Sequence, residues 1–76
     1  MHGYWRAPTR HGTFYIKLTR DRFVVLYGDE DLGSYHSPEA ALDDLVGGHT
    51  FPPSNGLDTS TAGLPSDLSE WEFVPR

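Results

Sequence analysis

Residues 32–48 constrain the fold of this chain most, because strand, cap, helix and stop signals follow one another there without conflict. Ser37 is a good N-cap, and Pro38 suits the first helical position, where its missing N–H leaves no helix bond unmade. Gly47 can adopt the left-handed conformation that ends a helix. The sequence therefore predicts a short strand followed by a helix from Pro38 to Val46.

The predicted helix carries one apolar stripe, with spacings of one, three and four residues. The residues of this stripe are Ala41, Leu42, Leu45 and Val46. Asp43 and Asp44 face away from it, although carboxylates near the negative end of a helix dipole are unfavourable. We interpret these acids as a contact for basic strands of the same fold or for an arginine of a partner. The stripe itself needs a sheet to lie on.

Alternating apolar residues predict strands on the N-terminal side of this helix. In residues 13–19 every second side chain is apolar, which is the period of a half-buried strand. Residues 22–27 are apolar on both faces, so we expect that strand to be central and covered on both sides. The polar residues 19–22 join the two strands as a hairpin, and a third strand over 32–36 leads into the helix.

Residues 47–65 form a connection longer than the roughly 12–15 residues at which irregular loops become unusual. Phe51, Leu57 and Leu64 are apolar anchors that a disordered linker would not need. We therefore expect an ordered loop that lies over one side of the sheet. One face of the sheet carries Tyr15, Lys17 and Arg22. We expect the loop to cover this face; the alternative is that the face is open to a ligand.

The C-terminal part predicts a helical turn and a further strand. Ser66 caps the single turn. Residues 70–74 alternate again and are expected to pair with residues 13–19, with their acids opposite Lys17. Together these elements predict one α+β domain over residues 1–76, in which an antiparallel sheet of three to four strands (β-β-β-α-loop-β) packs one helix on one face.

Residues 1–11 place aromatic side chains beside basic ones. These side chains are Tyr4, Trp5, Arg6 and Arg10. Such a combination is typical of surfaces that stack on single-stranded bases and attract phosphate. The alternative is that Trp5 covers the edge of the core and Arg6 lays its stem along it. Because Pro8 is unfavourable in a continuous strand, we expect an N-terminal arm, part of it mobile.

Charge is divided unevenly along the chain, whose net charge is −5. Residues 1–22 hold five of the six basic residues and one acid, whereas residues 23–75 hold ten acids and no lysine or arginine. Either the basic strands face the acidic helix and loops within the fold, or the basic end contacts a polyanion or an acidic partner. Two ends of opposite charge would also permit head-to-tail association.

The chain contains no cysteine, which excludes disulfides and thiolate zinc sites and favours a reducing, cytoplasmic setting. No apolar run approaches the roughly 20 residues that span a bilayer, and the first residues lack the apolar core of a signal peptide. We therefore expect a soluble cytoplasmic protein that makes no membrane contact and is not exported.

The histidines have no metal-ligand spacing. They are His2, His11, His36 and His49. A metal or enzymatic site would have to combine His36 and His49 with Asp44 or Asp58 in space. We instead expect His49, which follows two glycines, to act as a capping or hinge residue. No GxSxG elbow, P-loop or GxGxxG fingerprint is present, so the sequence predicts neither catalysis nor a cofactor.

Several segments resemble short bacterial proteins of the conserved hypothetical kind. These segments are residues 33–41, 48–51, 58–60 and 67–71, and the likeness spans most of residues 12–74. Such proteins carry no assigned activity, so the resemblance implies no catalytic residue. The passage from strand to helix is also similar to small DNA-binding modules with a three-stranded sheet and one helix, although the acid-rich remainder departs from a DNA-binding charge balance.

The sequence thus predicts a small, non-catalytic binding or interaction module with a protein partner. The candidate binding residues are Tyr4, Trp5, Arg6, Arg10, Lys17, Arg22, Asp43, Asp44 and His49. The alternative is nucleic-acid binding, which the net acidity disfavours. It would use the basic, aromatic part of the chain: Tyr4, Trp5, Arg6, Arg10, Lys17, Arg20 and Arg22. A second alternative is an enzyme or metal site around His36 and His49.

Overall fold

The structure, a computed structural model, describes residues 3–75. The first two residues of the predicted arm, one of which is His2, lie outside this range. The described chain forms an antiparallel sheet, one α-helix and two short 3₁₀ helices, η1 and η2. In chain order the elements are β1 (Gly3–Thr9), β2 (Gly12–Thr19), β3 (Arg22–Tyr27), β4 (Glu30–Tyr35), α1 (Pro38–Gly47), η1 (Thr59–Thr61), η2 (Leu68–Glu70) and β5 (Glu72–Pro75).

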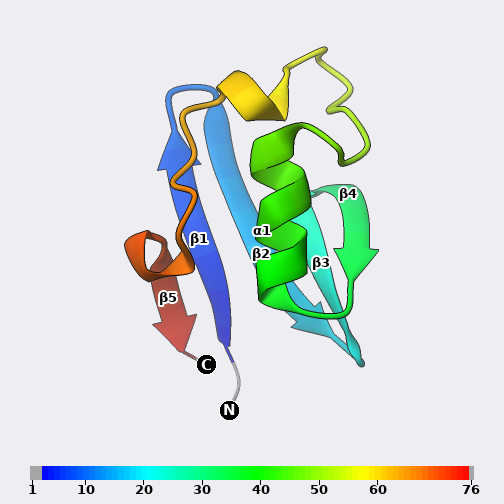
Figure 1. The fold of residues 1–76 in the computed structure, drawn as a ribbon, viewed down its shortest axis with the longest axis vertical. Helices are drawn as coiled ribbons and strands as arrows, with labels where there is room; N and C mark the ends of the chain where they lie inside the picture. The colour runs from blue at the N-terminus through cyan, green and yellow to red at the C-terminus, as the bar shows by residue number, and fades with distance from the viewer. Residues whose placement is uncertain (1–2, 76) are drawn as a thin grey trace.

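The sheet has five strands in the order β4-β3-β2-β1-β5 (Figure 1). The α+β class with one helix is confirmed, but the predicted count of three to four strands was too low because β1 was missed. The strand at residues 72–75 pairs with β1, not with β2 as predicted. Consequently Glu72 lies opposite Arg6, and no acid of β5 lies opposite Lys17.

Pro8 does not prevent a regular strand, so that prediction was wrong. β1 runs through Pro8 to Thr9 and pairs with β2 over residues 4–9. Pairing with β5 covers only residues 3–6 of β1. The proline therefore stands where β1 is an edge strand, which is the position at which a sheet tolerates a missing N–H.

The caps of α1 explain its bounds. Ser37 Oγ accepts a hydrogen bond from the Ala40 N–H at 3.1 Å, which confirms the predicted N-cap. At the other end Gly48, with φ of 76°, takes the left-handed position, whereas Gly47 stays in the helix. The predicted stop at Gly47 was therefore one residue early. The His49 N–H donates to the Asp44 carbonyl at 2.8 Å, so His49 caps the helix through its backbone.

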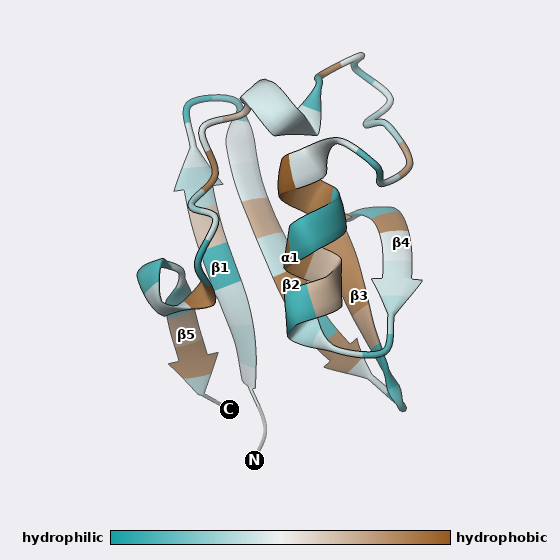
Figure 2. Cartoon of the chain, in the orientation of Figure 1, coloured by the Kyte–Doolittle hydropathy of each residue, from teal (hydrophilic) through white to brown (hydrophobic). Residues whose placement is uncertain are grey.

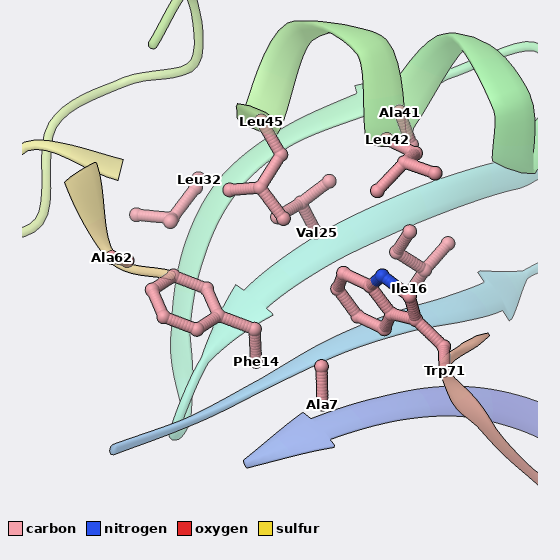
Figure 3. Close-up of a cluster of buried hydrophobic side chains, with 10 residues drawn as sticks. All are labelled: Ala7, Phe14, Ile16, Val25, Leu32, Ala41, Leu42, Leu45, Ala62 and Trp71. Carbon is pink, nitrogen blue, oxygen red and sulfur yellow. The ribbon is translucent and has the colours of Figure 1, made fainter. Parts of the chain in front are cut away.

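The core lies between α1 and one face of the sheet. In Figure 3 Leu42 and Leu45 point from α1 toward the side chains of Ile16, Val25 and Trp71. Figure 2 shows the apolar residues of α1 in brown between teal polar ones, as the predicted stripe requires. The buried apolar residues are Ala7, Phe14, Ile16, Val25, Leu32, Ala41, Leu42, Leu45, Ala62 and Trp71.

Residues 48–67 lie on the helix side of the sheet. Leu57 and Leu64 pack against the core as expected of anchors, but Phe51 is 72% exposed and is not one. The backbone N–H of Phe51 instead donates to the Leu32 carbonyl of β4 at 3.1 Å. Further on, the cap of η2 is Asp67, whose carboxylate accepts from the Ser69 N–H, not Ser66 as predicted.

Candidate binding surface

One face of the sheet has no element packed on it within the described residues. The helices and the long loop pack on the side of Phe14, Ile16 and Val25 (Figure 1). Strand alternation places the intervening residues on the other side. We call this side the open face; its residues are Tyr4, Arg6, Tyr15, Lys17, Arg22, Val24, Leu26, Glu72 and Val74. None of them is buried.

The open face corrects two predictions. The loop of residues 47–65 does not cover Tyr15, Lys17 and Arg22, because its apolar side chains are needed on the core side. β3 is an inner strand, yet it is not covered on both sides. Val25 is fully buried, whereas its neighbour Val24 is only half-buried on the open face. The face is therefore available to a ligand.

Tyr4, Tyr15 and Lys17 form the centre of the open face. Tyr4 and Lys17 are directly opposite each other on β1 and β2. The two tyrosine rings meet edge to face with centroids 5.9 Å apart, and Lys17 Nζ lies 4.8 Å from the Tyr4 centroid and 4.9 Å from that of Tyr15. An ammonium held over two rings is attracted by both, so the lysine is positioned before a partner arrives.

The other two cations of the open face have partners within the fold. Arg6 forms an ion pair with Glu72 on the neighbouring strand, and this contact holds the pKa of Arg6 above its ordinary value. Arg22 Nη2 donates to the Ser34 carbonyl at 3.2 Å. Within residues 3–75 no carboxylate pairs with Lys17. Lys17 is therefore the cation that this face offers to an incoming group.

A hollow of about 240 Å³ adjoins this centre where β1 begins and β2 ends. Tyr4 and Lys17 line it together with Gly3, Leu18 and Thr19. The hollow gives the open face a recess beside its aromatic and basic groups, which is the form of a surface that takes a side chain of a partner.

Trp5 does not lie on the open face with Tyr4. Adjacent residues of a strand point to opposite faces, so Trp5 lies on the helix side, with its ring centroid 5.1 Å from that of Phe73 and 6.4 Å from that of Phe23. This confirms that Trp5 covers the edge of the core. Arg6, however, lies on the open face and does not run along Trp5. Although Tyr4 and Trp5 are adjacent in sequence, they therefore do not form one aromatic surface.

The turn arginines are not part of one basic patch. Arg10 is exposed in the β1–β2 turn, and Arg20 is exposed in the β2–β3 turn, so the two lie at opposite ends of β2 (Figure 1). The predicted set of basic side chains is therefore divided along the sheet, and only part of it reaches the open face.

The remaining predicted residues lie on the helix side. Asp44 contacts the hydroxyl of Tyr35, and burial together with this contact raises the pKa of Tyr35 to about 12. Asp44 thus serves the fold through a tyrosine and not through a basic strand. Asp43 is exposed on α1. His49 is exposed and lines a groove beside β4 together with Phe51, and its ring lies next to Gly47.

Within residues 3–75, no three His, Asp or Glu side chains come together as a metal site requires. The proposed group of His36 and His49 with an acid is therefore not assembled. In the same part of the chain no helix has the length and apolar character needed to cross a membrane. Comparisons with protein-family models, curated proteins and solved structures found no match to this chain.

The juxtaposition of Tyr4, Tyr15 and Lys17 was not predicted, although a signal for it exists. Tyr4 and Arg6 alternate with Trp5 and Ala7 at the period of a strand, and Gly12 follows at turn distance. Reading residues 3–9 as a hairpin partner of residues 12–19 would have placed Tyr4 opposite Lys17.

Proposed function

We propose that the protein is a small, non-catalytic binding module that holds a protein partner on the open face of its sheet. The observation that carries this proposal is the cluster of Tyr4, Lys17 and Tyr15 on a face that no described element covers. Tyrosine is enriched in protein interfaces, and an antiparallel sheet can leave one face uncovered, where such side chains reach a partner.

The partner that fits this face carries an acidic group beside apolar side chains. Lys17 would meet the acidic group, because Arg6 is paired with Glu72 and Arg22 donates to the Ser34 carbonyl, whereas no carboxylate within residues 3–75 pairs with Lys17. Val24, Leu26 and Val74 are half-buried and supply apolar area around the cluster. The setting that we propose is the cytoplasm of a bacterium, which agrees with the absence of cysteine and with the resemblance described above.

Site-specific photo-crosslinking in the cells that make the protein tests this proposal. A benzophenone amino acid replaces Val24 on the open face or, as the matched control, the exposed Thr61 on η1. We expect a discrete crosslinked species from position 24 and none from position 61, and we expect Lys17→Glu to abolish it. Equal crosslinking from both positions, or no effect of Lys17→Glu, would contradict the proposal.

Single-stranded nucleic acid is the second candidate ligand, because bases stack on aromatic rings held beside a cation. Fluorescence anisotropy with labelled oligonucleotides at about 50 mM and 200 mM salt tests it. Binding that weakens with salt and with Tyr15→Ala would favour the nucleic acid. No binding at the lower salt concentration would leave the protein partner as the function of the open face.

A further inference from the structure

A groove of about 340 Å³ runs between α1 and residues 66–68, on the side of the sheet opposite the open face. Figure 1 shows the segment that leads into η2 on the same side of the sheet as α1. We call this recess the helix groove; its lining residues are Leu42, Val46 and Leu68, which are apolar, and Glu39, Asp43, Ser66 and Asp67, which are polar.

The helix groove has an apolar floor and an acidic rim. Leu42 and Val46 are four residues apart on α1, and so are Glu39 and Asp43. Each pair is therefore separated by about 6 Å along the helix axis, which makes two parallel rows, one apolar and one acidic. Asp67 adds a carboxylate from the opposite wall. An occupant must match both rows.

No basic side chain compensates the acidic row within residues 3–75, although Glu39 lies in the first turn of α1, where the helix dipole favours a carboxylate. No lysine or arginine lines the helix groove, and the ion pair recorded in residues 3–75, that of Arg6 with Glu72, lies on the open face. Asp44, which follows Asp43, contacts the Tyr35 hydroxyl. Asp43 stands in the unfavourable C-terminal half of α1 and is exposed to solvent.

We propose that the helix groove docks a basic, amphipathic segment of a partner protein. One apolar side chain of that segment packs on Val46 and Leu68, and arginine or lysine residues on either side of it pair with the rim carboxylates. Charge complementarity selects this occupant, since an acidic or neutral segment would leave the rim carboxylates desolvated without a partner. The proposal uses the side of the molecule that the open face does not, and it stands independently of the proposed function.

A synthetic peptide of five residues, with leucine at its centre flanked by two arginines on each side, provides the probe. Fluorescence anisotropy of the dye-labelled peptide at about 50 mM salt measures its binding to the full chain. We expect saturable binding that weakens at 300 mM salt, because the contacts on the rim are screened. The same peptide with serine in place of leucine should bind at least 5-fold more weakly. Absence of binding, or equal binding of the serine peptide, would overturn the proposal.

Two variants of equal charge locate the contact. Asp43→Asn removes a rim carboxylate, whereas Asp29→Asn removes an exposed carboxylate from the β3–β4 turn, outside the groove. We expect Asp43→Asn to weaken peptide binding by about 3- to 5-fold, which is the factor typical of one exposed ion pair. We expect Asp29→Asn to leave peptide binding unchanged. Equal effects of the two variants would show non-specific attraction to a net negative protein and would overturn the proposal.

The remaining outcomes separate this proposal from its rivals. Sedimentation velocity without peptide measures self-association; an oligomer that Asp43→Asn dissociates would assign the groove to a second copy and overturn the proposal. Lys17→Glu, on the open face, should leave peptide binding intact. Conversely, Asp43→Asn should leave the crosslink from position 24 intact, so that failure of one surface is distinguished from failure of the other.

Discussion

The two faces of the sheet differ in what their side chains do, although the same strands build both. On the covered face Phe14, Ile16 and Val25 are fully buried beneath α1. On the open face Tyr15 and Lys17, which alternate with them, are only half-buried. Under the proposed function, stability and binding are divided between alternate residues of a single strand, so we expect each to be changed with little effect on the other.

The strongest test of this comparison uses two neighbouring aromatic residues of β2. Phe14→Ala removes a fully buried side chain, and we expect it to lower the free energy of unfolding by about 3–5 kcal/mol. Tyr15→Ala removes a half-buried ring of the open face and should cost about 1 kcal/mol or less. Urea denaturation followed by tryptophan fluorescence measures both.

Phe14→Ala can leave too little folded protein to measure, because so small a domain has a modest total stability. Phe14→Leu then serves as the milder variant, and it should still cost more than Tyr15→Ala. A cost of Tyr15→Ala equal to that of either substitution at position 14 would show that the open face is a second structural face and would end the comparison.

Two adjacent glycines test the structure on the covered side of the sheet, at the C-terminal end of α1. Gly48 caps α1 with φ of 76°, and an added Cβ would lie 3.3 Å from Asp58 Oδ1 and Ser60 Cβ. We expect Gly48→Ala to lower the free energy of unfolding by about 1–2 kcal/mol. Gly47→Ala is the control, since Gly47 is helical and a Cβ there meets only the movable side chain of His49.

The expected effect of Gly47→Ala is a change of less than about 0.5 kcal/mol in either direction. Thermal denaturation by circular dichroism compares the two variants. Equal losses would indicate that α1 ends at Gly47, which would contradict the cap described here.

Tyr35 provides a pH test at the edge of the covered face. Burial, and then its contact with Asp44, raises the pKa of Tyr35 to about 12 from its ordinary value of 10.0. Because the folded pKa lies above the unfolded one, this residue contributes stability that is present below pH 10 and is lost as the pH rises toward 12. Difference absorbance at 295 nm between the wild type and Tyr35→Phe should show a titration near pH 12. A step near pH 10 would contradict the contact.

Asp67 provides the smallest effect, at low pH. Hydrogen bonds from the Ser69 backbone N–H and side chain hold the pKa of Asp67 below its ordinary value of 3.8. A depressed pKa adds stability above the unfolded pKa, and this is lost as the pH falls through the folded pKa. When the pH is lowered below about 4, the urea concentration at the unfolding midpoint of the wild type should therefore decrease. The midpoint of Asp67→Asn should decrease less over the same pH range. Identical acid profiles would show that ionisation of Asp67 adds no stability.

The parts of the fold that were predicted from sequence depend on local signals. Ser37, Pro38 and the apolar stripe of α1 lie within ten residues of one another, so their pattern already contains the information that the structure uses. The hairpin of β2 and β3 is local in the same sense.

The parts that were missed depend on contacts distant in sequence. Whether Pro8 is tolerated is decided by the length of β5, which pairs with residues 3–6 only. Whether Lys17 is covered is decided by the side on which residues 47–65 pack, and both sides offered apolar residues. Phe51 and Leu57 look alike as anchors in sequence, yet only Leu57 faces the core.

Pairing of β5 with β1 has a consequence for synthesis of the chain on the ribosome. β1 emerges before its second neighbour, residues 72–75, which follows more than sixty residues later. During that interval β1 is exposed as a nascent sheet edge that other chains can pair with. Pro8 offers no N–H to such a chain, so it weakens pairing at the end of β1 that β5 leaves uncovered even in the finished fold.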